Sequence, residues 1–162
     1  MLAKMQLLRS ILYALIFYPA TALFVLAGIA MSLFGSKATR ALVRSWAGFH
    51  RELAGNLLGV RPELEGQVPA GAALIAVKHE SMYETLEMLH LAETPVIVLK
   101  RELSQIPLFG WLTRRYGVIP VDRKAGPKAL REMVAAGKRA AAQGRSVIIY
   151  PEGTRVAPGA AD

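Results

Sequence analysis

Residues 72–100, "AALIAVKHESMYETLEMLHLAETPVIVLK", decide the fold. The apolar run at 72–77 predicts a buried strand, and residues 82–92 behind it predict a helix. Residues 94–100 are rich in valine and isoleucine and predict another strand. Short apolar strands that alternate with helices indicate an α/β domain with a largely parallel sheet.

The same alternation continues toward the carboxyl end of the chain. Residues 102–116 predict helical turns, which Pro107 and Gly110 interrupt. A clear helix is predicted over 126–144, with a proline near its start and a glycine at its end. We therefore expect a central, largely parallel sheet flanked by helices.

Three further segments predict strands. Residues 62–66, "PELEG", form a possible short strand, and residues 146–150 form a buried one. Residues 117–123 also predict a strand, but Pro120 removes a backbone donor and places it at an edge or an irregularity.

The amino-terminal part has a different composition, because residues 11–34 contain no charged side chain. As one helix this run would reach roughly 36 Å, and a bilayer core measures about 30 Å. Pro19 favours a kink or break, and basic residues flank both ends, so the positive-inside rule assigns no orientation. We therefore favour a bent or re-entrant membrane anchor, or a helical hairpin, over a single membrane span. A secretory signal peptide is a weaker alternative.

Residues 37–59 predict an amphipathic helix that ends at Gly59. Its apolar stripe either packs on the domain core or lies on a membrane surface. The predicted domains are membrane-anchoring helices at 1–60 and an α/β domain at 61–162. The stripe consists of Leu42, Trp46, Phe49, Leu53 and Leu57.

The overall composition narrows the partners. Apolar residues make up 53% of the 162 residues, the net charge is +8 and the mean hydropathy is +0.32. A basic chain fits nucleic acid or anionic lipid, and the apolar anchor favours lipid. No basic motif with interleaved aromatic residues is present, so we predict no nucleic-acid partner. The chain has no cysteine, which excludes disulfides, thiol catalysis and a cysteine zinc site.

His79 follows a predicted strand and precedes a helix, a position where ligand sites of open α/β sheets gather. A zinc motif is incomplete because Tyr83 stands where the second histidine would be. Ser81 and Glu84 match the capping box S-x-x-E. Alternatively, Glu84 could hold one ring nitrogen of His79 and leave the other to take a proton from a hydroxyl. The residues alone leave both roles of Glu84 open.

Cations follow several of the predicted strands. Lys100 and Arg101 follow one strand, Arg123 follows another, and Arg155 lies in "YPEGTR", residues 150–155, after the last. In a parallel sheet these strand ends lie along one edge, so the cations would line that edge. A cationic edge would suit a phosphorylated substrate, since arginine offers a planar donor fork for phosphate.

In this order, "KHESMYE", "LKRELSQIPLFGW", "GVIPVDR" and "YPEGTR" resemble the 1-acyl-sn-glycerol-3-phosphate acyltransferases, over about residues 40–156. The resemblance implies a membrane-bound enzyme that moves a fatty acyl group from acyl-CoA or acyl carrier protein to the free sn-2 hydroxyl of lysophosphatidic acid, giving phosphatidic acid. It implies no metal and no cofactor besides the acyl thioester, and a place at the cytoplasmic face of a bacterial inner membrane.

The resemblance also assigns roles. It implies that His79 is the general base and that Glu84 stands in place of the family's aspartate. The implied substrate-binding residues are Lys100, Arg123, Glu152, Gly153, Thr154 and Arg155.

Two alternatives remain open. The acceptor could be another lysophospholipid or a lyso-aminolipid. Family members usually continue past the E-G-T-R turn, whereas this chain stops at Asp162. A truncated, inactive lipid-binding fragment is therefore also an expectation. The sequence leaves the acyl chain length and the oligomeric state open.

Overall fold

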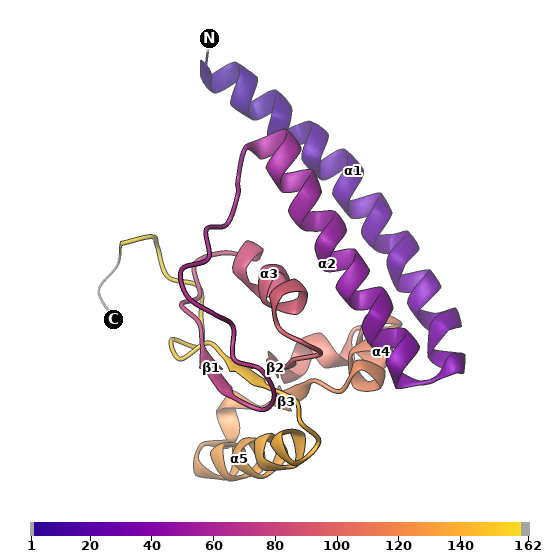
Figure 1. Ribbon diagram of the computed structural model, residues 1–162, viewed down its shortest axis with the longest axis vertical. Helices are drawn as coiled ribbons and strands as arrows, with labels where there is room; N and C mark the ends of the chain where they lie inside the picture. The colour runs from indigo at the N-terminus through magenta and orange to yellow at the C-terminus, as the bar shows by residue number, and fades with distance from the viewer. Residues whose placement is uncertain (1, 160–162) are drawn as a thin grey trace. The chain divides into compact units, whose positions relative to one another are not determined.

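The computed structural model describes residues 2–159 and divides into two compact units at residues 67 and 68. The amino-terminal unit is a helical hairpin of α1 (Leu2–Met31), a 3-10 turn η1 (Ser32–Phe34) and α2 (Ser36–Leu58) (Figure 1). Within the described residues, one helical segment, Ala3–Phe34, is long and apolar enough to cross a membrane by length and composition.

Of the predicted kink or break at Pro19, the break is wrong, because α1 continues through this residue, and the kink stays a prediction. Proline removes one backbone hydrogen bond from a helix, but its fixed φ is itself helical. The remaining hydrogen bonds of a 30-residue helix and its packing on α2 maintain the helical path.

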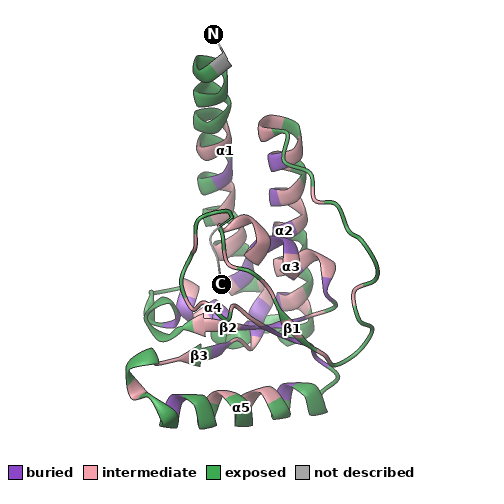
Figure 2. Ribbon diagram, turned by 90° about the vertical axis from the view of Figure 1, so that its left-hand side faces the viewer, coloured by how far each residue is buried: buried purple, intermediate pink, exposed green. Residues whose placement is uncertain are grey.

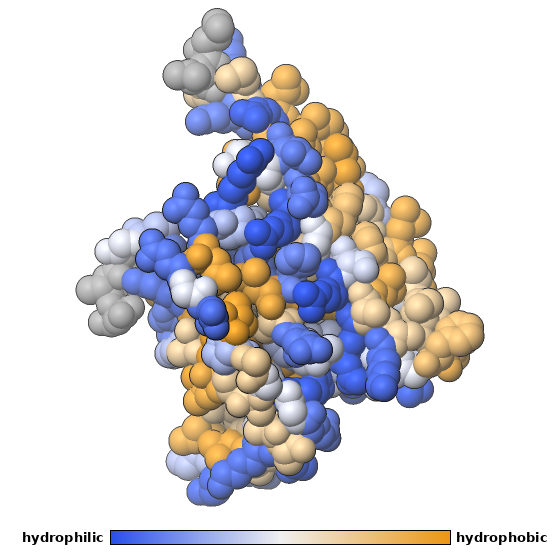
Figure 3. Space-filling view, in the orientation of Figure 1, coloured by the Kyte–Doolittle hydropathy of each residue, from blue (hydrophilic) through white to orange (hydrophobic). Residues whose placement is uncertain are grey.

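The apolar stripe of α2 packs in part against α1. Trp46 Nε1 donates a hydrogen bond of 3.0 Å to Thr21 Oγ1, and the Trp46 ring stacks on Phe17 at a centroid distance of 6.3 Å. Phe49 meets Phe24 at 5.9 Å. The hairpin therefore supplies a partner for the stripe that neither predicted alternative named. The other side of α1 exposes many large apolar side chains (Figure 3), including Leu7, Leu8, Leu15, Leu23 and Leu26.

The carboxyl-terminal unit contains a four-stranded sheet in the order β1-β4-β2-β3, and all its pairs are parallel. Helices α3 and α5 lie on opposite sides of this sheet (Figures 1 and 2). The predicted α/β class is therefore confirmed. The strands are β1 (Leu74–Ala76), β2 (Val96–Lys100), β3 (Ile119–Val121) and β4 (Val147–Ile149), and the helices are α3 (Tyr83–Leu91), η2 (Arg101–Gln105), α4 (Phe109–Tyr116), η3 (Arg123–Ala125) and α5 (Pro127–Ala142).

The buried core lies between this sheet and α5. Val96 of β2 and Val147 of β4 are buried there together with Ala140 of α5. This agrees with the prediction that 146–150 is a buried strand, because β4 has a strand on each side. Strand β3 is at the edge and exposes Pro120, so the missing donor costs no hydrogen bond within the sheet.

Two strand predictions are wrong. Residues 62–66 form no strand; they begin with a proline and pair with no other described segment, and an unpaired strand gains no ladder hydrogen bonds. Strand β1 exists, but it is not buried as predicted: Leu74 is 71% exposed. An apolar run indicates a strand, but it does not tell whether a neighbour covers it, and β1 is an edge strand in this sheet.

Arg145, which sequence reasoning did not single out, ties the amino-terminal end of the sheet together. It is 8% exposed and directs its guanidinium at backbone carbonyls. The Nε group donates to Thr94 O at 2.9 Å, and Nη2 donates to Pro95 O and Tyr116 O at 3.1 and 3.2 Å. Gly117 has a φ of +92°, and a Cβ there would lie 2.7 Å from Nη1, so this position favours glycine.

We predict that Arg145→Met lowers the free energy of unfolding by roughly 2–4 kcal/mol, because it leaves several buried carbonyls without donors. Denaturant unfolding followed by circular dichroism measures this change. The matched control is Arg139→Met, at an exposed position of α5, which should change stability little. Equal effects of the two substitutions would contradict the assigned role of Arg145.

Candidate active site

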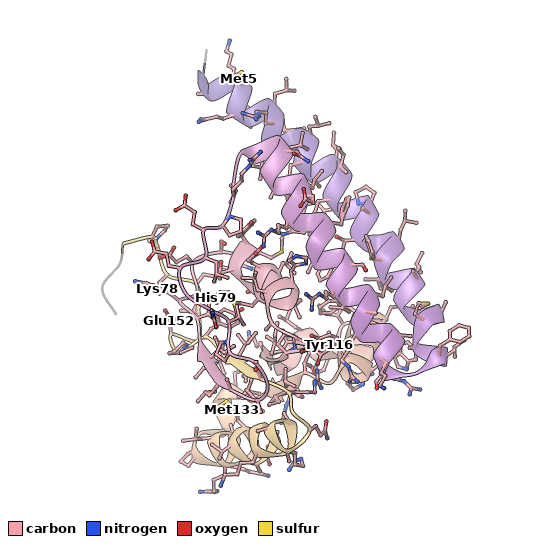
Figure 4. All side chains as sticks on the ribbon, viewed as in Figure 1. Met5, Lys78, His79, Tyr116, Met133 and Glu152 are labelled. Atoms are coloured by element: carbon pink, nitrogen blue, oxygen red, sulfur yellow. The ribbon has the colours of Figure 1, made fainter. Side chains whose placement is uncertain are left out.

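Parallel pairing brings the carboxyl ends of all four strands to one edge of the sheet. His79 follows β1, Lys100 ends β2, Arg123 follows β3, and the turn 150–155 follows β4. This edge, which we call the rim, therefore carries every residue singled out from the sequence except Glu84, which lies in α3. In Figure 4, His79 and Glu152 lie close together there.

Glu84 makes the central contacts of the rim. Its Oε1 lies 2.7 Å from Nδ1 of His79. Both carboxylate oxygens also lie 3.0 Å from the Ser81 amide nitrogen, and the Ser81 hydroxyl donates to Oε2. That hydroxyl in turn accepts from the amide of Tyr83 at 2.9 Å. Glu84 therefore takes part in both roles that the sequence left open. It accepts from Ser81, one residue before Met82, the N-cap of α3, which itself has no side-chain cap, and it holds His79.

The charge of Glu84 fixes the proton on the histidine ring. Burial alone raises the pKa of the Glu84 carboxyl, but hydrogen bonds from Ser81, His79 and the backbone outweigh it, so the pKa is lowered overall. An ionised carboxylate only accepts hydrogen bonds. Nδ1 of His79 must therefore carry the proton, and Nε2 of the neutral ring has a free lone pair. Nε2 has no hydrogen-bond partner within residues 2–159, and the His79 side chain is 20% exposed.

The turn after β4 is joined to the His79 backbone. Glu152 Oε1 accepts from the His79 amide at 3.4 Å, and the Val156 amide donates to the His79 carbonyl at 2.8 Å. Gly153 closes the turn through a bond from its amide to Tyr150 O at 3.0 Å. Glu152 Oε2 is buried and has no hydrogen-bond partner among the described residues. The E-G-T-R turn and the histidine segment thus form one structural unit.

Tyr150 is a site residue that sequence reasoning missed. Its ring lies against the imidazole of His79 at a centroid distance of 4.6 Å and an angle of 41°. Burial, chiefly, raises the pKa of the Tyr150 hydroxyl to about 12, so the phenol stays neutral. One signal was available in the sequence: Tyr150 directly follows β4, at the same edge as His79. Nothing in the sequence indicated that the two rings touch.

The predicted cations are only partly brought together. The Arg123 guanidinium approaches the E-G-T-R turn, since its Nη1 lies 3.6 Å from where a Cβ on Gly153 would be. Lys100 instead pairs with Glu102 at 3.5 Å on the surface. Thr154 and Arg155 are exposed and make no hydrogen bond or ion pair within residues 2–159. The rim therefore presents cations to solvent beside a histidine with a free nitrogen.

Comparison with known proteins places this geometry in context. A family model described as acyltransferase matches residues 60–161. The chain is 34% identical over 122 residues to a 1-acyl-sn-glycerol-3-phosphate acyltransferase of Pseudomonas aeruginosa, covering 74% of this chain and 48% of that protein. It is 35% identical over 102 residues to the Helicobacter pylori protein of the same description, covering 62% and 42%.

A third curated relative has a different acceptor in its name. The lyso-ornithine lipid O-acyltransferase of Rhizobium meliloti is 31% identical over 119 residues, covering 73% of this chain and 39% of that protein. The chain thus spans about half the length, or less, of the curated relatives it matches. The crystal structure of a 1-acyl-sn-glycerophosphate acyltransferase from Thermotoga maritima has the same fold, with a TM-score of 0.67 and 24% identity, covering 93% of this chain and 64% of that one.

We predict that Glu84→Gln lowers stability in a pH-dependent way. The folded pKa of Glu84 is lowered, so its charge stabilises the fold fully above the ordinary carboxyl pKa of about 4.3. This contribution is lost as the pH falls through the lower folded value. The difference in unfolding free energy between the parent and Glu84→Gln should therefore shrink from about pH 7 to about pH 3. The exposed Glu80→Gln serves as the matched control, and a difference independent of pH would contradict the charged cap.

Proposed function

The chain belongs to the acyltransferase family, and on this basis we propose that it transfers a fatty acyl group from an acyl thioester to the free hydroxyl of lysophosphatidic acid. The observation that carries the proposal is the His79–Glu84 pair, bonded through the His79 backbone to the E-G-T-R turn. The names of the Pseudomonas and Helicobacter relatives support the acceptor. The product would be phosphatidic acid.

In the proposed mechanism, Nε2 of His79 removes the proton from the sn-2 hydroxyl while that oxygen attacks the thioester carbonyl. The imidazolium that forms is stabilised by the Glu84 carboxylate at Nδ1, and it then gives its proton to the departing thiolate. Tyr150 covers one side of the imidazole and, with Glu84, restricts the ring to one orientation. No covalent enzyme intermediate enters the scheme, because the hydroxyl attacks the thioester directly.

The phosphate of the acceptor would be bound by cations of the rim. Arg123 lies beside the E-G-T-R turn, and the exposed Arg155 is on it. Guanidinium groups bind phosphate in a bidentate way. Lys100, Glu152 and Thr154 complete the proposed acceptor site. We propose no metal or cofactor; the co-substrate is acyl-CoA or acyl carrier protein.

The hairpin fits a lipid substrate. Its long apolar helix would hold the protein at the membrane, and we propose the cytoplasmic face, where acyl thioesters are available. Lysophosphatidic acid and its product both partition into lipid, so a tethered enzyme would meet them there.

A second acceptor class is favoured by one observation. The Rhizobium relative is described as acting on lyso-ornithine lipid, an aminolipid. The same base could act on its hydroxyl, since the chemistry at His79 does not involve the phosphate. The phosphate-binding arginines would then be dispensable.

We predict that the purified chain acylates lysophosphatidic acid and that His79→Ala lowers the rate about 10²–10⁴-fold, because the base is lost. Transfer of a radiolabelled acyl group from acyl-CoA and from acyl carrier protein measures this rate. His90→Ala, in the last turn of α3, is a control for removal of an imidazole. Undiminished activity of His79→Ala would exclude the mechanism. Absence of any turnover by the parent would favour a protein that binds lipid without catalysis.

Arg155→Ala separates the two acceptor classes within the same assay. With lysophosphatidic acid as acceptor, the substitution should raise KM more than it lowers kcat, because it removes a phosphate contact that is present in both ground and transition states. Turnover of lyso-ornithine lipid should be spared. Equal losses with both acceptors would show that Arg155 does not bind the phosphate.

A further inference from the structure

The segment that follows β2 exposes several large apolar side chains to solvent. We call residues 101–111 the apolar loop; it consists of η2, the turn that follows it and the first residues of α4. Leu103, Ile106 and Leu108 are 40%, 45% and 54% exposed. Single exposed apolar residues are ordinary on protein surfaces, but a cluster on one loop marks an interaction site.

Hydrogen bonds tie the backbone of the apolar loop to itself and to α4. Ser104 Oγ donates to Arg101 O at 2.6 Å, and Arg114 Nη1 donates to Ser104 O at 2.7 Å. The Gly110 amide donates to Ile106 O at 2.7 Å, and a Cβ on Gly110 would lie only 2.1 Å from Ser104 O. These contacts fix the backbone from which the exposed side chains project, which lowers the backbone entropy lost when a partner covers them.

The backbone at Leu108 is strained. Its φ is +61° and its ψ is −57°, and the Phe109 amide donates to Pro107 O at 2.6 Å. This is the classic γ-turn, which is rare and costly for a residue with a side chain. This strained backbone exposes the leucine side chain to water, so the side chain adds little apolar burial to the folded state. The cost is offset if a lipid bilayer buries Leu108.

Basic groups surround the apolar loop. Lys100, Arg101, Arg114 and Arg115 are all exposed. Two of these cations are paired with acids, Lys100 with Glu102 and Arg101 with Asp122. Arg114 and Arg115 make no ion pair within residues 2–159, so the border keeps a net positive charge. The Arg115 guanidinium lies 5.4 Å over the ring of Trp111. Apolar tips with a tryptophan and a basic border are characteristic of proteins that bind anionic membrane surfaces.

We propose that the apolar loop inserts Leu103, Ile106 and Leu108 into the interface of an anionic lipid bilayer. The α/β unit then has its own membrane contact, in addition to any contact made by α1. Because the loop begins where β2 ends, this contact would bring the rim to the lipid surface. The proposal concerns binding only, so it can fail or hold independently of acyl transfer.

Fluorescence of Trp111 tests the proposal in the full chain. The chain has two tryptophans, so Trp46→Phe leaves Trp111 as the sole reporter. We expect vesicles of brominated phosphatidylglycerol to quench Trp111, and vesicles of brominated phosphatidylcholine to quench it much less. In the Trp46→Phe background, Ile106→Glu with Leu108→Glu should abolish this quenching even where the protein still sediments with the vesicles.

A matched control pair lies on α5. Val134 and Leu130 are 46% and 57% exposed. These exposed fractions are similar to those of Ile106 and Leu108. The double change Val134→Glu with Leu130→Glu should therefore keep the quenching. Circular dichroism verifies that each variant is folded. Quenching of Trp111 in the Trp46→Phe chain with the native loop tests the proposal even if a loop variant does not fold.

Three results would overturn the proposal. The first is a vesicle-bound protein in which Trp111 is not quenched. The second is quenching that is equal for the anionic and the zwitterionic vesicles. The third is a Trp111 emission that is blue-shifted and protected from acrylamide before vesicles are added, which would mean that another protein surface covers the loop.

Discussion

The carboxylate of Glu84 has to meet two demands at once, and the arrangement of the rim depends on this. It accepts from Ser81 at the start of α3 and from Nδ1 of His79. The histidine is thereby fixed to the same turn that begins the helix. Any motion of the imidazole would disturb the cap, which couples the order of the site to the stability of α3.

Parallel strand pairing supplies the second condition. The histidine segment, the arginine after β3 and the E-G-T-R turn are far apart in the sequence, but the sheet brings them to one edge. Hydrogen bonds from the turn after β4 to the His79 backbone then join two of these segments directly. The side chains of Glu84 and Glu152 take part in these contacts. Arg155 and Thr154 do not, and both are exposed to solvent.

The sequence predicted the strands and helices of this domain well where the signal is local. Strand β4 and helix α5 were recognisable from an apolar run, a proline and a glycine. The exposure of Leu74 could not be predicted, because burial depends on what lies beside an edge strand. The continuity of α1 through Pro19 likewise depends on contacts made along the whole helix.

The candidate site shows the same division. His79 and Glu84 were predicted because they lie only five positions apart and their spacing resembles a family motif. The contact of Tyr150 with His79 joins two strands, and no local pattern encodes it. The strained turn at Leu108 was also missed, since a leucine at positive φ contradicts its own preference. Local preference therefore failed where distant contacts determine the conformation.

The proton on the His79 ring tests the central claim most directly. Nitrogen-15 correlation spectra of the labelled chain distinguish the two neutral tautomers, and His79→Gln identifies the His79 signals among the three histidines. If Glu84 holds Nδ1, the neutral ring should carry its proton on Nδ1, with Nε2 unprotonated. A ring protonated on Nε2 in the folded protein would contradict the account, because the nitrogen proposed as the base would then have no lone pair to use.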